Sequence, residues 1–371
     1  MGTLFCQYYK ERCIFSMKFH PNIFIVGDEY HIVVITKKQS QVSIKIGRKL
    51  YREDNGGIVP SLDIVHKIII PQQALDKKGS YTVCVRRTID KRPYFPVFGE
   101  EEQKTYTFKN DRFDGLKGYY LADTHSQYDR AKKLASYYSD NDFIIYNGDF
   151  GETNSVADIM ELNKFFSDVT KGSIPILFVR GNHDTRGKLS EFLYKYTGMN
   201  GQKGYFRFSF RSIEGLALDC GEDKPDKNPE YGGCANCFTE YRKEQAKFLQ
   251  KVKLLKGKYK LAVCHTSFMR QESMHGQFDI EREGYAKWAS ELNKKGLQGM
   301  LTGHIHRIKF WQANSEDSVQ SHNYPIISGS QMLKNPDGTL DMRGTALLFE
   351  NGKIFLNATD EEQNVTHRYE F

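Results

Sequence analysis

The sequence has no long hydrophobic run and little cysteine. None of its apolar stretches approaches the roughly 20 residues that a membrane-crossing helix needs, and its first residues lack a basic region followed by a long apolar one. Its seven cysteines are an odd number in a chain of 371 residues, which fits a reducing compartment better than a disulfide framework. We therefore expect a cytoplasmic protein with no membrane partner.

Repeats, low-complexity tracts and a basic tail are also missing. The 53 Lys and Arg residues exceed the 46 Asp and Glu residues, but they are spread over the whole length. Such dispersed charge gives only weak support for nucleic-acid binding and is compatible with a small anionic substrate. Hydrophobic residues make up 39% of the chain and aromatic residues 13%, which excludes a disordered protein, and the length indicates about two domains.

The first part of the chain contains short runs typical of β-strands. Runs rich in β-branched and aromatic residues begin at Ile23, Tyr30, Val42, Val65 and Tyr81. Between them lie turn signals and no convincing helix. This pattern favours a β-sandwich of the immunoglobulin or fibronectin kind, which we assign to residues 1–110.

Beyond residue 110, strands alternate with helical patterns, which is typical of a layered α/β domain. We assign residues 111–371 to this second domain. Its expected helices cover about 127–138, 155–169, 189–196, 240–255 and 283–295, and Ser155 with Asp158 resembles a capping box.

Five turns of the second domain follow predicted strands and carry side chains that bind metals. They are Asp123-Thr-His125, Gly148-Asp149, Gly181-Asn-His-Asp184, Cys264-His265 and Gly303-His-Ile-His306. One such turn alone is better explained as a helix cap or a surface turn. Five in succession, three of them with a glycine that permits close backbone approach, indicate a metal site.

Carboxylate and amide oxygens mixed with imidazoles suit divalent first-row ions such as Mn, Fe, Co, Ni or Zn. This number of ligands is too large for one four-coordinate ion and suits two. One carboxylate must then bridge the ions, and Asp149, alone on its turn, is the natural choice.

The five motifs and their order resemble the calcineurin-like metallophosphoesterase superfamily over about 116–371. The resemblance implies a four-layered α/β/β/α domain with two metal sites. It assigns Asp123, His125, Asp149 and His306 to one metal, and Asp149, Asn182, His265 and His304 to the other. It also makes His183 the residue that faces the substrate and protonates the leaving oxygen. Asp184 is a candidate to orient His183, and a plain helix-capping role is the alternative.

One related branch, the purple acid phosphatases, also carries an amino-terminal β-sandwich. Its members replace the histidine of the first motif and place a metal-bound tyrosine three residues after the bridging Asp. Here His125 is present and Glu152 stands where the tyrosine would be. We therefore expect two divalent ions and no tyrosinate-iron centre.

The predicted activity is that of a metal-dependent phosphohydrolase that cleaves phosphomonoesters or phosphodiesters by in-line attack of metal-bound hydroxide, with no covalent phosphoenzyme. A small phosphorylated substrate is the expected partner. One alternative is a nuclease or nucleic-acid phosphodiesterase that uses the same site. The other is a catalytically silent scaffold, which the complete ligand set disfavours.

Several further residues have weaker signals. Cys234 and Cys237 have the spacing of half a zinc knuckle, but with only Cys220 nearby they are better explained as loop thiols. On the same loop, Lys224 and Tyr231 are candidates to reach the substrate. A pocket could be lined by His275, Trp288 and Trp311, although packing residues have the same signature.

Overall fold

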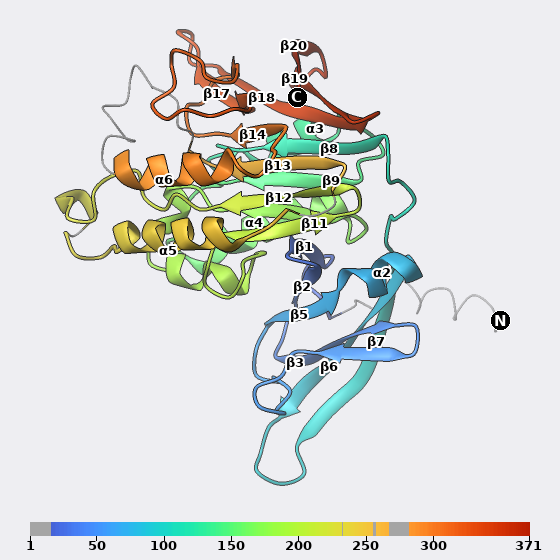
Figure 1. Cartoon of the computed structure of the whole chain (residues 1–371). Coiled ribbons are helices and arrows are strands. Elements are labelled where there is room, and N and C mark those ends of the chain that lie inside the picture. Colours follow the sequence, from blue (N-terminus) through green and yellow to red (C-terminus); the bar gives the residue numbers. More distant parts are fainter. Residues whose placement is uncertain (1–15, 232, 255–256, 267–281) are drawn as a thin grey trace.

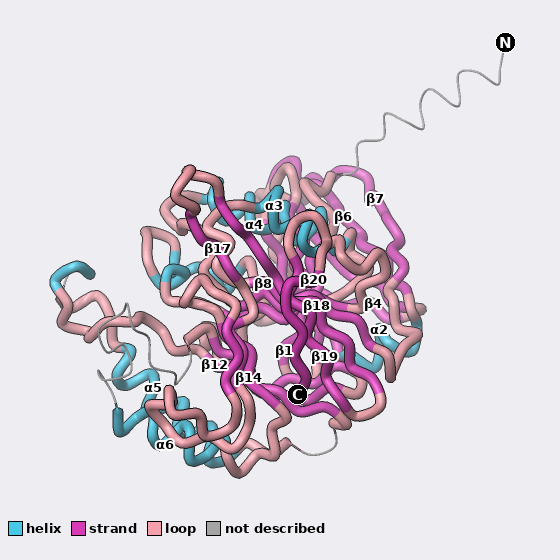
Figure 2. Tube along the Cα trace, turned by 90° about the horizontal axis from the view of Figure 1, so that it is seen from above, coloured by secondary structure: helices cyan, strands magenta, loops and turns pink. Residues whose placement is uncertain are grey.

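The computed structural model of the protein describes residues 16–231, 233–254, 257–266 and 282–371. Within these residues the strands form a ten-stranded, a six-stranded and a four-stranded sheet. Figure 1 shows the layered part of the molecule above the strand-rich amino-terminal part, which is coloured blue. Seen from above in Figure 2, α5 and α6 lie on one side of the strands, and α3 and α4 lie on the other.

The ten-stranded sheet runs through both parts of the chain. At its centre β8, β9 and β10 are parallel neighbours. Such an arrangement brings the carboxyl ends of neighbouring strands to one edge of the sheet. The strand order is β20 (Val365–Glu370), β19 (Lys353–Thr359), β18 (Leu340–Glu350), β8 (Leu116–Leu121), β9 (Phe143–Asn147), β10 (Ile176–Val179), β1 (Asn22–Val26), β2 (Glu29–Ile35) and β5 (Val65–Pro71), with β17 (Gln331–Lys334) paired to β18.

The six-stranded sheet lies in the second half of the chain. Its parallel core consists of β12, β13, β14 and β16, and antiparallel strands close both ends. The order is β11 (Phe206–Phe210), β12 (Ile213–Leu218), β13 (Tyr259–Cys264), β14 (Gly299–Thr302), β16 (Ile326–Ser328) and β15 (Lys309–Trp311).

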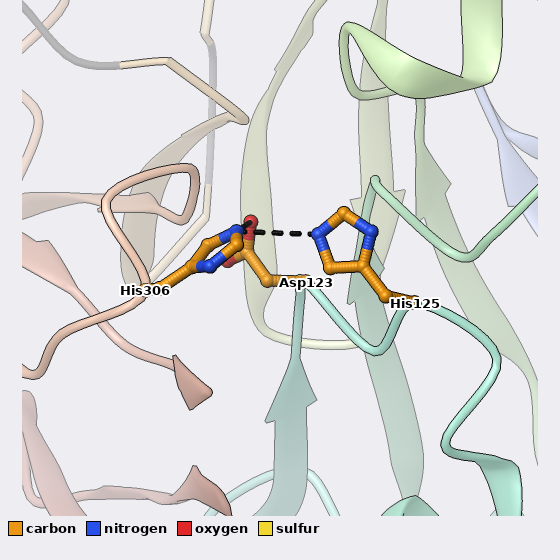
Figure 3. Close-up of side chains that lie close together, drawn as sticks. All are labelled: Asp123, His125 and His306. Carbon is orange, nitrogen blue, oxygen red and sulfur yellow. Dashed lines mark hydrogen bonds and ion pairs between the residues drawn. The ribbon is translucent and has the colours of Figure 1, made fainter. Parts of the chain in front are cut away.

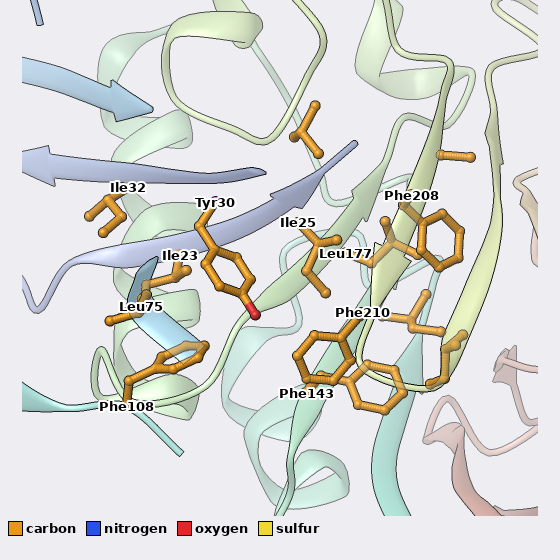
Figure 4. Close-up of a cluster of buried hydrophobic side chains, with 14 of the residues drawn as sticks. Ile23, Ile25, Tyr30, Ile32, Leu75, Phe108, Phe143, Leu177, Phe208 and Phe210 are labelled. Atoms are coloured by element: carbon orange, nitrogen blue, oxygen red, sulfur yellow. The ribbon is translucent and has the colours of Figure 1, made fainter. Parts of the chain in front are cut away.

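Three clusters of buried side chains hold the layers together. The first fills the space between the two sheets and includes Leu177, Phe208 and Val263; Figure 4 shows part of it. The second packs α3 (Tyr128–Ala135) and α4 (Val156–Thr170) on the large sheet. The third packs α5 (Phe238–Lys251) and α6 (Arg282–Leu292) on the other sheet. The expected α/β/β/α layering is thereby confirmed.

Local sequence signals explain the ends of several helices. The capping box of α4 is present, because Ser155 Oγ accepts from the backbone N–H of Asp158 and the Asp158 carboxylate accepts from the backbone N–H of Ser155. A short helix that the sequence analysis missed, α2 (Gln72–Lys78), follows Pro71 and ends at Gly79, which has the left-handed conformation. Glycine in this conformation is a typical residue at the end of a helix. The expected helix at 189–196 is a 3₁₀ helix, η2 (Ser190–Lys195).

The amino-terminal part is strand-rich, as expected, but its strands divide between two sheets. A four-stranded sheet contains β4 (Lys49–Arg52), β3 (Ser40–Ile46), β6 (Ser80–Asp90) and β7 (Val97–Thr107) in this order. In contrast, β1, β2 and β5 extend the large sheet, where β1 pairs in parallel with β10 through Phe24 and Ile176. An immunoglobulin-like topology and a domain boundary near residue 110 remain predictions.

The described helices include none that is long and apolar enough to cross a membrane. In the same part of the chain, Cys84, Cys220, Cys234, Cys237 and Cys264 are free thiols. Cys234 and Cys237 are exposed, and neither belongs to a group of candidate metal ligands among the described residues. Nothing in the described residues therefore gives this pair a binding role.

Candidate metal centre

All five predicted turns meet at one place between the two sheets. The turns that carry Asp123, Asp149 and Asn182 follow β8, β9 and β10 of the large sheet. Those that carry His265 and His304 follow β13 and β14 of the six-stranded sheet. Because these strands are parallel neighbours within each sheet, their carboxyl ends deliver all the polar side chains to a single site.

One group of candidate ligands consists of Asp123, His125 and His306, whose ligand atoms all lie within 4.8 Å of one another. Figure 3 shows the three side chains converging from two separate turns. The Nε2 atoms of His125 and His306 are 3.2 Å apart, and His306 Nε2 is 3.5 Å from Asp123 Oδ1. A single ion can therefore contact all three side chains.

Another group consists of Asp149, His265 and His304, again with all ligand atoms within 4.8 Å. His265 Nε2 lies 3.2 Å from Asp149 Oδ2. The amide oxygen of Asn182 lies 3.1 Å from His304 Nδ1, which adds a fourth donor to this group. The predicted ligands of the second metal thus lie together.

The two groups adjoin each other through their carboxylates. Asp149 Oδ2, which belongs to the second group, is 4.0 Å from His125 Nε2 of the first. Asp123 Oδ1, which belongs to the first, is 3.6 Å from His265 Nε2 of the second. Both carboxylates therefore stand between the two sets of imidazoles.

The backbone at these turns is in the left-handed region at five ligand positions. The φ angles are 53° at Asp123, 39° at His125, 54° at Asp149, 73° at His304 and 54° at His306. Non-glycine residues seldom adopt such angles, and strained residues of this kind concentrate at functional sites. The fold holds these ligands in a conformation that most other positions of the chain avoid.

Two glycines are needed because the turns approach each other closely. A Cβ atom at Gly181 would lie 2.3 Å from Asp149 Oδ1. At Gly303 it would lie 2.7 Å from both Ala122 Cβ and Asp123 Oδ2. These distances leave no room for a side chain, which explains why glycine stands in these motifs.

Hydrogen bonds fix the Asp123 carboxylate. Asp123 Oδ2 accepts from Ser330 Oγ at 2.6 Å, and the backbone N–H of His304 donates to the carboxylate at 3.0 Å. Ser330 follows β16 and was not identified from the sequence, because a serine after a strand is indistinguishable from an ordinary turn residue.

Asp184 connects two of the turns through the backbone. Its carboxylate accepts from the backbone N–H groups of Gly181 at 2.7 Å, Asp149 at 3.0 Å and Phe150 at 3.1 Å. Burial, followed by the charge of Asp149, raises the pKa of Asp184 to about 7, and two of these N–H donors oppose the rise. The orienting contact with His183 that the sequence suggested is not among the hydrogen bonds of Asp184 within the described residues.

His183 lies at the open side of the centre, with 39% of its side chain exposed. Its Nε2 atom is 3.9 Å from Asp149 Oδ2, and its ring packs edge-to-face on His125 at 5.1 Å between centroids. Burial lowers the pKa of His183, with the Asp149 carboxylate acting in the opposite direction. The ring therefore borders the metal ligands and also reaches solvent.

The chemistry of the donors fits bound cations. The Nδ1 atom of His265 lies 2.6 Å from the backbone oxygen of Asn147, so the proton of a neutral ring is placed on that nitrogen. The buried Nε2 atom then has no hydrogen-bond partner and points its lone pair at two carboxylates. A divalent cation between them satisfies all of these atoms.

The electrostatics of the ion-free side chains agree with this interpretation. Burial alone lowers the pKa of His265, but Asp149 and Asp123 raise it well above its usual value. Burial and the charge of His265 lower the pKa of His304 to about 3. The buried carboxylates thus attract positive charge, while His304 stays neutral and is able to bind a metal.

Comparison with known proteins identifies the family. Residues 119–307, just over half of the chain, match the family described as calcineurin-like phosphoesterase. The chain belongs to this family, and it is therefore a metal-dependent hydrolase that acts on phosphoester bonds. None of the curated proteins matches the chain.

Several solved structures are similar to this one. The purple acid phosphatase PPD1 of yellow lupin (Lupinus luteus) has 12% sequence identity and a TM-score of 0.56, over 94% of this chain and 73% of that protein. A dimetal phosphatase of Danio rerio has 11% identity and a TM-score of 0.44, over 69% and 98%. The protein TT1561 of Thermus thermophilus has 14% identity and a TM-score of 0.36, over 62% and 98%. At these identities the likeness to the lupin enzyme concerns the fold alone.

The residues that were weaker candidates for a substrate contact or a pocket lie in different surroundings. Lys224 pairs with Asp223 at 3.4 Å and with Glu230 at 3.5 Å. The side chain of Tyr231 and the whole of His275 lie outside the described residues. Both Trp288 and Trp311 are buried in the third core cluster, which makes them packing residues.

Proposed function

We propose that this protein hydrolyses phosphoesters by in-line attack of water at a dinuclear metal centre, without a covalent phosphoenzyme. The observation that carries the proposal is the meeting of two ligand groups at Asp149 and Asp123. A pair of ions about 3.5 to 4 Å apart is the arrangement that clamps a phosphoryl group during in-line displacement. A small phosphorylated compound is the proposed substrate.

The proposed ligands divide as the two groups do. Asp123, His125 and His306 would hold one ion, Asn182, His265 and His304 would hold the other, and Asp149 would contribute to both. Asp149 suits the bridge because its Oδ1 atom accepts from the backbone N–H of His183 at 2.9 Å, which leaves Oδ2 directed toward histidines of both groups. When bound, divalent Mn, Fe, Zn, Ni or Co ions polarise the phosphoryl oxygens and lower the pKa of water toward about 7.

His183 is the proposed proton donor to the leaving oxygen. It stands beside the bridging carboxylate but keeps part of its ring open to solvent, as a residue that contacts substrate must. Asp184 supports the same turn by holding the backbone of Gly181 against that of Asp149. General acid catalysis of this kind contributes about 10²- to 10⁴-fold in rate.

The test combines metal analysis with hydrolysis of p-nitrophenyl phosphate and bis-p-nitrophenyl phosphate, with Mn or Ni added. Asp149→Asn is expected to lower the content of both metals and to abolish turnover. In contrast, His183→Ala should lower turnover of a phenyl ester, whose leaving oxygen needs a proton, about 10²-fold or more and leave the metal content nearly intact. Metal loss in the His183 variant would contradict the assignment of His183 as a proton donor and not a ligand. A parent protein that binds no metal and cleaves neither ester would be a silent scaffold.

A panel of nucleotides, cyclic nucleotides, sugar phosphates and phospholipid head groups then distinguishes monoesterase from diesterase activity. The nuclease alternative predicts cleavage of DNA or RNA with an affinity that falls steeply with salt. Cleavage of small esters by a protein that binds neither DNA nor RNA at any salt concentration would exclude that alternative.

A further inference from the structure

The Arg186 side chain lies between the ring of His183 and the loop that follows β12. Its Nη1 atom is 3.4 Å from His183 Nδ1 and 3.3 Å from His183 Nε2. A neutral imidazole has one nitrogen with a free lone pair. Arg186 is close enough to donate to that nitrogen in either tautomer.

A buried carboxylate holds the other edge of the guanidinium. Arg186 Nε donates to Glu222 Oε2 at 2.6 Å and Nη2 donates to Glu222 Oε1 at 2.7 Å. The side chain of Glu222 is 1% exposed, whereas that of Arg186 is 25% exposed. Two parallel hydrogen bonds to a buried carboxylate fix both the position and the plane of a guanidinium.

The loop that carries Glu222 is itself anchored. Arg242, which is buried on α5, donates from Nη1 to the backbone oxygens of Cys220 at 2.6 Å and Glu222 at 3.1 Å. The backbone N–H of Asp223 donates to Glu222 Oε1 at 2.8 Å. A chain of contacts therefore runs from a core helix through Glu222 and Arg186 to the His183 ring.

The His183 ring is consequently held on two sides. His125 packs against it edge-to-face on one side, and Arg186 contacts both its nitrogens on the other. A partly exposed side chain without such neighbours samples several rotamers. A proton donor needs one orientation, since a misplacement of about 1 Å in a catalytic group costs on the order of 10²-fold in rate.

The charges around Arg186 favour a positioning role over a direct clamp on substrate phosphate. The guanidinium contacts Glu222 and also Asp223, whose Oδ1 atom is 3.2 Å from Nη2. Both carboxylates contact its single positive charge, and Asp223 is shared with Lys224 at 3.4 Å. The contribution of Arg186 to the site is therefore the planar, two-pronged geometry of its guanidinium and not its net charge.

We propose that Arg186, fixed by the buried carboxylate of Glu222, is a positioning residue that holds the His183 ring in the orientation from which it protonates the leaving oxygen. This inference rests on the proposed function of His183. It assigns a role to two residues that lie outside the metal-binding motifs.

The test compares good and poor leaving groups. Hydrolysis of a p-nitrophenyl ester depends little on proton donation, because the leaving oxyanion is stable, whereas hydrolysis of a phenyl ester depends on it strongly. In the metal-loaded protein, Arg186→Gln is expected to lower kcat about tenfold or more for the phenyl ester and less than about threefold for the p-nitrophenyl ester. Metal content should stay unchanged.

Two further variants separate geometry from charge. Arg186→Lys keeps the charge but cannot form the two-pronged contact, so it should lose about as much activity as Arg186→Gln. Glu222→Gln should reproduce the leaving-group effect without touching Arg186 itself. Full activity of the lysine variant would overturn the positioning role, because charge alone would then suffice.

A matched control is available at Arg207. This residue is 26% exposed, donates from Nε to the buried carboxylate of Glu214 at 2.7 Å, and contacts Asp28 at 2.9 Å. It lies on β11, outside the metal-binding turns. Arg207→Gln removes an equivalent ion pair. It should change neither the ratio of the rates for the phenyl and p-nitrophenyl esters nor the metal content.

A double-mutant cycle decides whether Arg186 acts through His183. If it does, Arg186→Gln should have almost no further effect on the phenyl ester in a His183→Ala background. An equal loss in both backgrounds, or metal loss in Arg186→Gln, would refute the inference. If His183→Ala itself lowers both esters equally, the proposed proton donor is wrong, and that outcome is distinct from the failure of Arg186 alone.

Discussion

Asp184 offers a direct test of how the site is held together. Its carboxylate accepts from three backbone N–H groups, those of Gly181, Asp149 and Phe150, and its side chain is completely buried. Asp184→Ala removes the carboxylate that accepts all three hydrogen bonds and leaves the donors inside the protein without partners. The structure therefore predicts a loss of stability from this change and not merely a loss of turnover.

The size of the effect follows from these contacts. Above pH 7, Asp184, with its pKa of about 7, is ionised. A hydrogen bond to such a charged acceptor contributes about 1.5 to 3 kcal/mol, and an unpaired buried donor costs about 1 to 3 kcal/mol. Because the three bonds share one acceptor, they do not add fully, and we expect Asp184→Ala to cost about 3 to 5 kcal/mol. Asp184→Asn should recover only part of this free energy, since its amide nitrogen cannot accept from an N–H.

Thermal unfolding in the presence of a chelator is the appropriate assay, because metal loss then cannot contribute to the difference. Asp184→Ala should unfold about 4 to 6 °C below the parent protein. His183→Ala is the control and should stay within about 1 kcal/mol of the parent. If Asp184→Ala instead unfolds with the parent and loses turnover as His183→Ala does, Asp184 acts on the catalytic ring and the backbone explanation is wrong.

Three further changes have defined outcomes. Burial lowers the pKa of His31 to about 3, so folding favours its neutral form. This contribution to stability is complete well above the unfolded pKa of about 6.5, and about 2 kcal/mol of it should be lost between about pH 8 and pH 5. Urea unfolding at both pH values measures the loss, and an equal loss in His31→Leu would assign it elsewhere. Gly181→Ala places a Cβ atom 2.3 Å from Asp149 Oδ1 and should lower metal content, whereas Gly99→Ala, with ordinary contacts of 3.6 Å to Arg87, should not. Removal of metal by a chelator should lower the unfolding temperature, and Mn at about 100 times its Kd should restore about 2.7 kcal/mol of the free energy of unfolding. An unfolding temperature that neither the chelator nor Mn changes would contradict a bound metal.

The ligands of the metal centre could be predicted from the sequence because each follows directly from a strand end. Once Asp123 and Asp149 are placed after parallel strands, the sheet itself brings them together, whatever the loops between them do. Arg186 and Glu222 could not be predicted in this way. They are 36 residues apart, belong to no motif, and meet only because a loop of one sheet reaches a turn of the other.

The division of the amino-terminal strands between two sheets was also not foreseen, although the sequence contains a signal. The strand β3 alternates buried with partly buried or exposed residues, as one face of a sandwich does. In contrast, β1 is buried throughout and β2 in all but its first residue. Continuous apolar runs such as Ile23 to Val26 are typical of strands covered on both faces, and they indicate a place inside a layered sheet.

This arrangement connects the amino-terminal part of the chain to the metal centre. The turn with Asn182 and His183 follows β10, which has β9 on one side and β1 on the other. Without β1, the strand that carries this turn would be an exposed edge, and edge strands have unpaired backbone groups. The pairing is reinforced by Phe24 of β1, whose ring packs edge-to-face on Phe166 and Phe178 at 5.7 Å and 6.5 Å. The amino-terminal strands therefore complete the sheet that positions the metal ligands, and this gives them a structural role in ordering the site.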